Sequence, residues 1–530
     1  MNSMLTRMGG FGSPEDASIN SITLFVVLLL SCVVIGHLLE KSRWMTESVI
    51  ALLIGLLTGT IILLTTGWKS SHILVFDEEL FFIYLLPPII FNAGFQVKKK
   101  QFFKNFMAIV LYGVVGSMIS FAIISLGSIQ LFKGLDIGVL DLGDYFAGIC
   151  FFFPFGSNIF TQKLIDCEVL NQEETPLLYS LVFGEGVVND ATSVVLFNAI
   201  QKFDLSHITS ANILQFVGNF FYLFLTSTLL GVAVGLFSAY IIKKLCFARH
   251  STDREVALMF LMAYLSYMLA ELLDLSGILT VFFCGIAMSH YTWHNVSGSS
   301  KVTSRHAFAA FSFVSEIFIF LYVGMDALDM EKWKFASKSP WTLVASSGLL
   351  LCLVLLGRAA FVFPLSSLAN LFRKSNNDKI TFKQQVVIWW AGLMRGAVSV
   401  ALAYNKFTRS GHTQLQGNAI MITSTIIVVL LTNVVGGLLT KPLIRLLLNP
   451  HKHSGISVDS DLSPSKRLTL PLLSNEHESE SNVDIGNPLD SNRTVHHYWR
   501  IFDDSIMRPV FGGRGFAPVA PDSERDVILR

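Results

Sequence analysis

Apolar segments long enough to cross a lipid bilayer follow one another along most of the chain, and they restrict its fold more than any other feature. A spanning α-helix needs about 20 apolar residues. Because lipid offers no partner for backbone polar groups, such segments must form helices. The sequence therefore predicts an all-α polytopic membrane protein with about 13 transmembrane helices. They are predicted near residues 21–39, 48–66, 79–96, 106–132, 145–165, 177–199, 213–242, 256–273, 276–290, 307–325, 341–370, 384–405 and 417–447.

Composition and motifs exclude several classes of protein. Of the 530 residues, 52% are hydrophobic and 15% are charged, whereas soluble domains carry about 25% charged residues. The net charge is only +1, whereas a nucleic-acid binder typically carries a strong excess of positive charge. No phosphate-binding loop and no metal-type Cys/His spacing occurs in the sequence, so neither ATP-driven pumping nor a cofactor is predicted.

The chain divides into three parts by composition. Residues 1–20 form a short amino-terminal segment, 21–447 the transmembrane part, and 448–530 a polar tail. The tail has too little apolar surface to offset the entropy of ordering, so we expect a largely disordered, regulatory segment. Its stretch 508–511 is a candidate for docking on a partner protein or on the membrane surface.

Basic residues indicate which ends of the helices face the cytosol. They gather after odd-numbered spans, at 98–104, 243–254 and 373–383. The positive-inside rule places these loops, and with them the tail, in the cytosol. The sequon at Asn295 falls in a loop of the same side, where a glycan is not expected.

The segment 184–190 carries acids and an amide within an apolar span. A carboxylate in mid-membrane costs roughly 2.5 kcal/mol or more, so it usually faces a cavity, a partner or an ion path. Asp190 can hold either a proton or a monovalent cation on the same oxygens, and this competition is the minimal mechanism of antiport. We predict that Asp190 is the shared carrier and Asn189 its orienting neighbour, although polar residues can also serve only to join helices.

Two arginines, Arg358 and Arg395, also lie within apolar spans. Each needs a carboxylate or a helix end as a partner, and Glu185 is the buried acid available to one of them. We expect these three residues to brace the ion site. Glycines on both sides of Arg395 permit a broken helix, which transporters use to build sites at mid-membrane depth.

A third motif occupies the span near residues 79–96, where tandem prolines remove backbone donors and kink the helix. Such a kink either lines a cavity or serves packing. The residues of this segment are Leu85, Leu86, Pro87, Pro88, Ile89, Ile90, Phe91 and Asn92.

Together these motifs resemble those of the plant vacuolar sodium (potassium)/proton antiporters, the NHX class of monovalent cation:proton antiporters, over nearly the whole chain. The segment 85–92 resembles the family's amiloride-associated segment, and 183–193 its ion-site helix. Residues 394–399 and 357–359 match the regions of its intramembrane arginines.

The resemblance implies an inverted-repeat fold with broken crossing helices, working as a homodimer through an elevator-like movement. It also implies electroneutral exchange of cytosolic Na⁺ or K⁺ for lumenal H⁺ across the vacuolar membrane, in support of salt tolerance and pH control. Na⁺, K⁺, H⁺ and membrane lipid are then the binding partners, with a regulatory protein at the tail. A cation channel is a weaker alternative because the sequence shows no filter-like repeat.

One segment departs from the family. Residues 146–168 lack the Thr-Asp-Ser motif of the crossing helix, and Asp166 lies too late in the segment to replace its aspartate. Divergence, alternative splicing or a faulty gene model would each produce this difference. It supports the alternative that the chain is a transport-impaired isoform acting as a regulatory or dimer partner.

Overall fold

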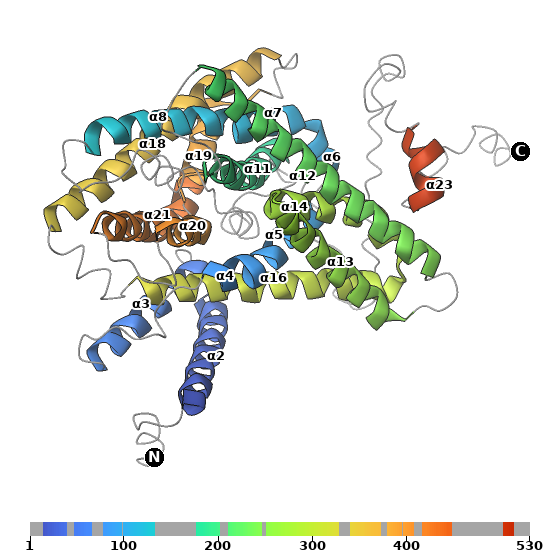
Figure 1. The fold of residues 1–530 in the computed structure, drawn as a ribbon, viewed down its shortest axis with the longest axis horizontal. Coiled ribbons are helices and arrows are strands. Elements are labelled where there is room, and N and C mark those ends of the chain that lie inside the picture. The colour runs from blue at the N-terminus through green and yellow to red at the C-terminus, as the bar shows by residue number, and fades with distance from the viewer. Residues whose placement is uncertain are drawn as a thin grey trace, which may run out of the picture.

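The computed structural model describes residues 14–39, 47–65, 78–97, 99–132, 176–201, 210–245, 251–327, 340–372, 379–394, 396–407, 416–447 and 502–512. The regular elements in these ranges are all helices (Figure 1). Within the same ranges, nine helices are long and apolar enough to cross a membrane. The prediction of an all-α polytopic fold is confirmed.

Every predicted span within the described residues corresponds to one helix or to consecutive helices, and only in the span 384–405 are two helices separated by a break. The predicted span near 145–165 lies outside the described residues. In chain order the elements are α2 (Pro14–Leu39), α3 (Glu47–Thr65), α4 (Glu78–Leu80), η2 (Phe81–Leu85), α5 (Leu86–Gln96), α6 (Lys99–Lys104), α7 (Phe106–Val110), η3 (Leu111–Gly116), α8 (Ser117–Phe132), α11 (Pro176–Gln201), α12 (Ser210–Leu245), α13 (Thr252–Leu272), α14 (Gly277–Ala287), η4 (Met288–Thr292), α15 (Trp293–Asn295), α16 (Gly298–Asp326), α18 (Pro340–Phe372), α19 (Phe382–Ala391), α20 (Ala397–Phe407), α21 (Gln416–Leu447), η8 (Asp503–Met507) and α23 (Arg508–Phe511).

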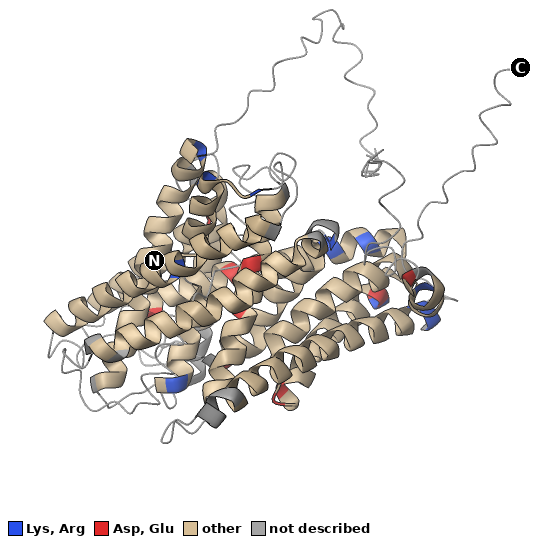
Figure 2. Ribbon diagram, turned by 90° about the horizontal axis from the view of Figure 1, so that it is seen from above, with Lys and Arg blue, Asp and Glu red and all other residues tan. Residues whose placement is uncertain are grey.

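Burial separates outer helices from a central one. In α2 only 11% of the spanning window is buried, and in α12 only 28%, whereas the window of α11 is buried completely. The outer helices expose large apolar side chains such as Leu30 and Leu229, as helices in contact with lipid do. Charged residues are few along the ribbon (Figure 2). The polar helix α11 is therefore shielded from lipid by its neighbours.

The helices pack in two groups. Helices α8 and α21 pack on α18, while α3, α5, α14 and α16 pack on one another; α11 contacts α7, η3, α12, α14 and α19. Helices α3 and α16 approach closely because Gly55 and Gly324 face each other, and a Cβ on either residue would meet the other helix's backbone. Small residues at such crossings are typical of membrane proteins.

The predicted span 384–405 is two helices rather than one. Helix α19 ends at Ala391 and α20 begins at Ala397; residues 392–394 and Gly396 are not helical, and Gly392 and Gly396 favour such a break. The break anticipated from these glycines is thus present, and it leaves the carboxyl end of α19 inside the bundle. Arg395 lies outside the described residues.

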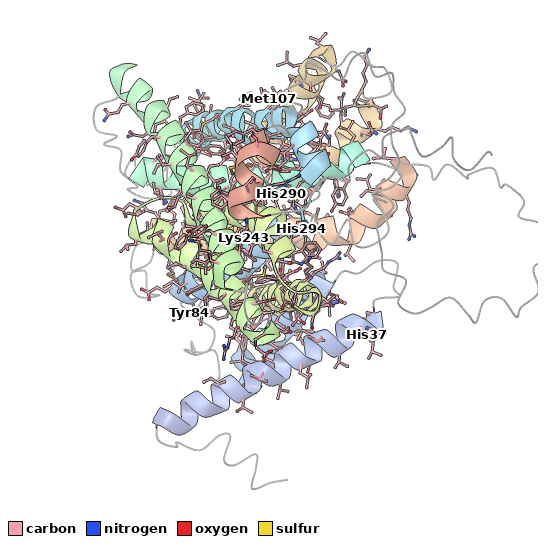
Figure 3. All side chains as sticks on the ribbon, turned by 90° about the vertical axis from the view of Figure 1, so that its right-hand side faces the viewer. His37, Tyr84, Met107, Lys243, His290 and His294 are labelled. Carbon is pink, nitrogen blue, oxygen red and sulfur yellow. The ribbon has the colours of Figure 1, made fainter. Side chains whose placement is uncertain are left out.

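Part of the tail packs on the transmembrane part. Tyr291 OH donates to Asp503 Oδ1 (2.6 Å), Lys243 Nζ donates to the Pro509 carbonyl (2.6 Å), and Asn295 Nδ2 donates to the Phe511 carbonyl (2.7 Å). Figure 3 shows this short helix beside Lys243, His290 and His294. The candidate docking stretch 508–511 therefore docks on its own chain.

Further contacts show which loops between the helices lie at the same end of the bundle. Lys99 Nζ, after the third span, donates to the Ser289 carbonyl (2.8 Å) at the end of the ninth. Asn295 Nδ2 donates to the Ala239 carbonyl as well (3.2 Å), so a glycan on this nitrogen would disrupt the packing. The loops after the third, seventh and ninth spans, together with 502–512, thus meet at one end of the bundle.

Candidate functional site

The polar residues predicted on α11 are all inside the protein. Glu185 is 4% exposed, Asn189 2% and Asp190 5%. Glu185 and Asn189 are one turn apart and share a face, whereas Asp190 lies about 140° around the helix from Glu185. The helix therefore presents its two acids in different directions.

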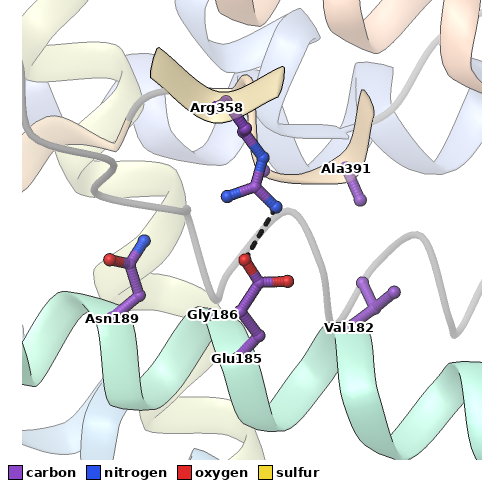
Figure 4. A pocket seen from close by; sticks show the side chains of 7 residues that line it. Val182, Glu185, Gly186, Asn189, Arg358 and Ala391 are labelled. Carbon is purple, nitrogen blue, oxygen red and sulfur yellow. Dashed lines mark ion pairs between the residues drawn. The ribbon is translucent and has the colours of Figure 1, made fainter. Parts of the chain in front are cut away.

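Arg358 on α18 faces Glu185. Its Nη2 lies 2.9 Å from Glu185 Oε1 (Figure 4). The same guanidinium donates from Nε to the Trp389 carbonyl (2.9 Å) and from Nη2 to the Ile388 carbonyl (2.8 Å). These carbonyls belong to the last turn of α19, where the backbone bond from Gly392 N–H to the Ile388 carbonyl is long (3.4 Å) and where the negative end of the helix dipole lies. One buried cation thus joins α11, α18 and the broken helix.

The break at the end of α19 makes room for this arrangement. A Cβ at Gly392 would overlap the guanidinium of Arg358, so only glycine leaves the arginine in place. A small cavity opens beside the ion pair. Its lining residues come from α11, α18 and the α19 break and are Val182, Glu185, Gly186, Asn189, Arg358, Ala391 and Gly392.

Asn189 contacts a residue that the sequence analysis missed. Ser117, the first residue of α8, places Oγ 2.6 Å from Asn189 Oδ1, and Ser193 Oγ donates to the Asn189 backbone carbonyl (2.7 Å). Ser117 directly follows the π-helical turn η3. Such turns often occur at functional sites, but a serine in an apolar helix gives no sequence signal of this role.

The remaining predicted site residues lie elsewhere or outside the described chain. The segment 85–92 forms the end of η2 and the start of α5, which packs against α14 and α16. Asn92 Oδ1 accepts a hydrogen bond from Gln96 Nε2 (2.9 Å), and the lining of the cavity includes none of these eight residues. Arg395 and the segment 146–168 are not among the described residues.

The arrangement combines a buried carboxylate, an amide and a broken helix in a membrane bundle, which is the architecture of a secondary transporter's ion site. Comparison with known proteins agrees. The family model "Sodium/hydrogen exchanger, transmembrane" matches residues 25–446, and the chain belongs to this family.

Plant proteins are among its most similar relatives. Sodium/hydrogen exchanger 1 of Oryza sativa subsp. japonica is 64% identical over 527 residues, which covers 98% of this chain and 97% of the relative. Sodium/hydrogen exchanger 2 of Arabidopsis thaliana is 64% identical over 536 residues, with the same coverage. The resemblance predicted from the motifs is confirmed at the level of plant sodium/hydrogen exchangers.

A solved structure supports the fold. The sodium proton antiporter MjNhaP1 from Methanocaldococcus jannaschii superposes with a TM-score of 0.58 at 16% identity, over 81% of this chain and 99% of that structure. This likeness concerns the fold, which is that of a cation/proton antiporter.

Proposed function

We propose that the protein is an electroneutral antiporter that exchanges cytosolic Na⁺ or K⁺ for lumenal H⁺ across the vacuolar membrane. The observation that carries the proposal is the burial of the whole spanning window of α11 with Asp190 and Asn189 side by side, in a chain of the sodium/hydrogen exchanger family. Vacuolar residence, potassium transport, a homodimer and a role in salt tolerance extend the proposal through the resemblance to the plant vacuolar class.

In the proposed cycle Asp190 carries either a proton or a cation. Binding of one ligand expels the other, so net transport couples the two gradients without a second energy source. Glu185 is neutralised by Arg358 at 2.9 Å and so leaves Asp190 as the acid that exchanges its ligand on α11. A single exchanging acid supports one-for-one, electroneutral exchange.

The test is cation-induced proton efflux from acid-loaded proteoliposomes that contain the full chain. We expect Na⁺ or K⁺ to release protons, and Asp190→Asn to abolish the release because the amide cannot hold a proton in exchange for a cation. Asp253→Asn, which removes an exposed acid from the first turn of α13, serves as the control and should transport normally. Efflux that persists in Asp190→Asn would contradict the proposal.

A second candidate function rests on residues 146–168, which lack the Thr-Asp-Ser motif. We propose as the alternative that the chain is transport-impaired and acts as a regulatory or dimer partner. Folded protein that shows no efflux, and gains it when the family's usual segment replaces 146–168, would establish this alternative. Efflux from the unaltered chain would exclude it.

The docked segment 502–512 supports a regulatory role for the tail. It holds the end of α12 through Lys243 and the end of the α14–α15 region through Tyr291 and Asn295. A regulatory protein that captures the tail would have to release these contacts or bind beside them.

A further inference from the structure

Ser117 contacts two acceptors with one hydroxyl group. Its Oγ lies 2.6 Å from Asn189 Oδ1 and also within hydrogen-bond distance of the Gly113 carbonyl. The residue is completely buried. A serine hydroxyl has one hydrogen to donate and two lone pairs that accept. It therefore cannot donate fully to both acceptors.

Two arrangements resolve this conflict. In the first, the hydroxyl donates to Asn189 Oδ1, and the amide's Nδ2 points away from Ser117. In the second, the hydroxyl donates to the Gly113 carbonyl and accepts a hydrogen bond from Nδ2, so that Oδ1 points away. Both arrangements keep Ser117 bonded to the amide, and they differ by a half-turn of the amide group.

The π-helical turn η3 prepares Ser117 for the second arrangement. In an α-helix the backbone N–H of Ser117 would donate to the Gly113 carbonyl. Here it donates to the Val114 carbonyl instead. The side-chain hydroxyl takes this place at the Gly113 carbonyl. Serine commonly donates to a carbonyl one turn back, and its lone pairs then remain available to accept from Asn189.

Which amide atom points away from Ser117 matters because Asn189 lines the cavity beside α19 and adjoins Asp190. An oxygen directed there attracts a monovalent cation, as carbonyl oxygens do in ion sites. An N–H group directed there repels a cation and donates to a carboxylate instead.

We propose that Ser117 is a positioning residue that holds the Asn189 amide in either orientation. It donates to Oδ1 when no cation is bound, and accepts from Nδ2 when a cation is bound to Oδ1 and Asp190. The proposal rests on the proposed antiport function and adds to it a residue on α8 that acts through Asn189.

The test compares Ser117→Thr with Ser117→Val in the proteoliposome assay. Threonine and valine have the same shape, but only threonine keeps the hydroxyl. Ser117→Val loses one hydrogen bond in the cation-free arrangement and two in the cation-bound one, and this difference of one bond should raise the cation KM about three- to tenfold, with a smaller change in the maximal rate. Because protons then compete more effectively, the pH of half-maximal exchange should rise. Ser117→Thr should remain close to the unaltered protein.

Ser120→Ala is the matched control. Ser120 is buried on the same helix one turn further on, and its hydroxyl has no hydrogen-bond partner among the described residues. Its removal should leave KM unchanged. Folding is checked for every variant by a monodisperse elution profile and by stabilisation against heat on addition of Na⁺, which reports binding without transport.

Equal effects of threonine and valine would show that side-chain shape matters rather than the hydroxyl, and would overturn the proposal. An unchanged KM in Ser117→Val would overturn it as well. The Asp190→Asn variant separates this from the proposed function. If Asp190→Asn is inactive while Ser117→Val behaves normally, only the role of Ser117 fails; if Asp190→Asn still exchanges ions, the antiport site itself is wrong.

Discussion

Two regions of the molecule each combine an acid with an arginine, but they connect the chain differently. In the brace, formed by Glu185 and Arg358, the two charges come from separate helices, and both side chains are almost completely buried. In the tail dock, formed by residues 502–512 and the surface that they contact, Asp503 and Arg508 pair with each other (3.1 Å) within the docked segment. If α11 and α18 separated, each buried charge of the brace would lose its partner. The tail, in contrast, can undock with its ion pair intact.

The largest expected effect is that of breaking the brace on one side. Arg358→Ala should leave Glu185 and the last carbonyls of α19 without their cation, and removal of one partner of a buried pair costs about 3–5 kcal/mol. We expect a strong loss of folded protein in detergent, measured by the temperature at which half of the protein aggregates in a fluorescence-detected size-exclusion assay.

Glu185→Gln is the control for this variant. Arg358 keeps its two hydrogen bonds to the Trp389 and Ile388 carbonyls, so we expect a smaller loss than for Arg358→Ala. The double variant Glu185→Leu with Arg358→Leu should be more stable than Arg358→Ala, because no buried charge is left alone. If both single variants proved as stable as the unaltered protein, the brace would not hold the helices together.

The brace and the dock also differ in how much of each the sequence predicts. The apolar span of α11 and its acids predict a buried polar helix, and an arginine in a neighbouring span predicts a partner for Glu185. The carbonyls of Ile388 and Trp389 cannot be predicted in this way, because they become acceptors only where α19 ends. The role of Ser117 cannot be predicted from the sequence either. It depends on the turn η3, after which the backbone N–H of Ser117 donates to the Val114 carbonyl instead of the Gly113 carbonyl.

The dock is less predictable still. Its segment is short, and its contacts are backbone carbonyls that meet Lys243 and Asn295, which lie more than 200 positions earlier in the chain. Local composition marks residues 448–530 as polar and says nothing about such distant partners. The all-α fold was predictable because membrane burial imposes one rule on every span, whereas docking follows from individual side chains.

A smaller effect is expected from weakening the dock. Tyr291→Phe removes the hydrogen bond from the phenol to Asp503 Oδ1 but leaves the Asp503–Arg508 pair in place. Burial, followed by the hydrogen bond to Asp503, raises the pKa of Tyr291, so the phenol remains a donor throughout the physiological range. A bond to a charged acceptor contributes about 1.5–3 kcal/mol, so the undocked fraction should rise roughly ten- to 150-fold.

Chymotrypsin cleavage after Phe511 measures this fraction, because the residue is only partly exposed when docked. Tyr240→Phe is the matched control: its ring keeps the contact with Lys244 Nζ, which lies 4.6 Å from the ring centre. Equal cleavage of both variants and the unaltered protein would show that the phenol does not hold the tail.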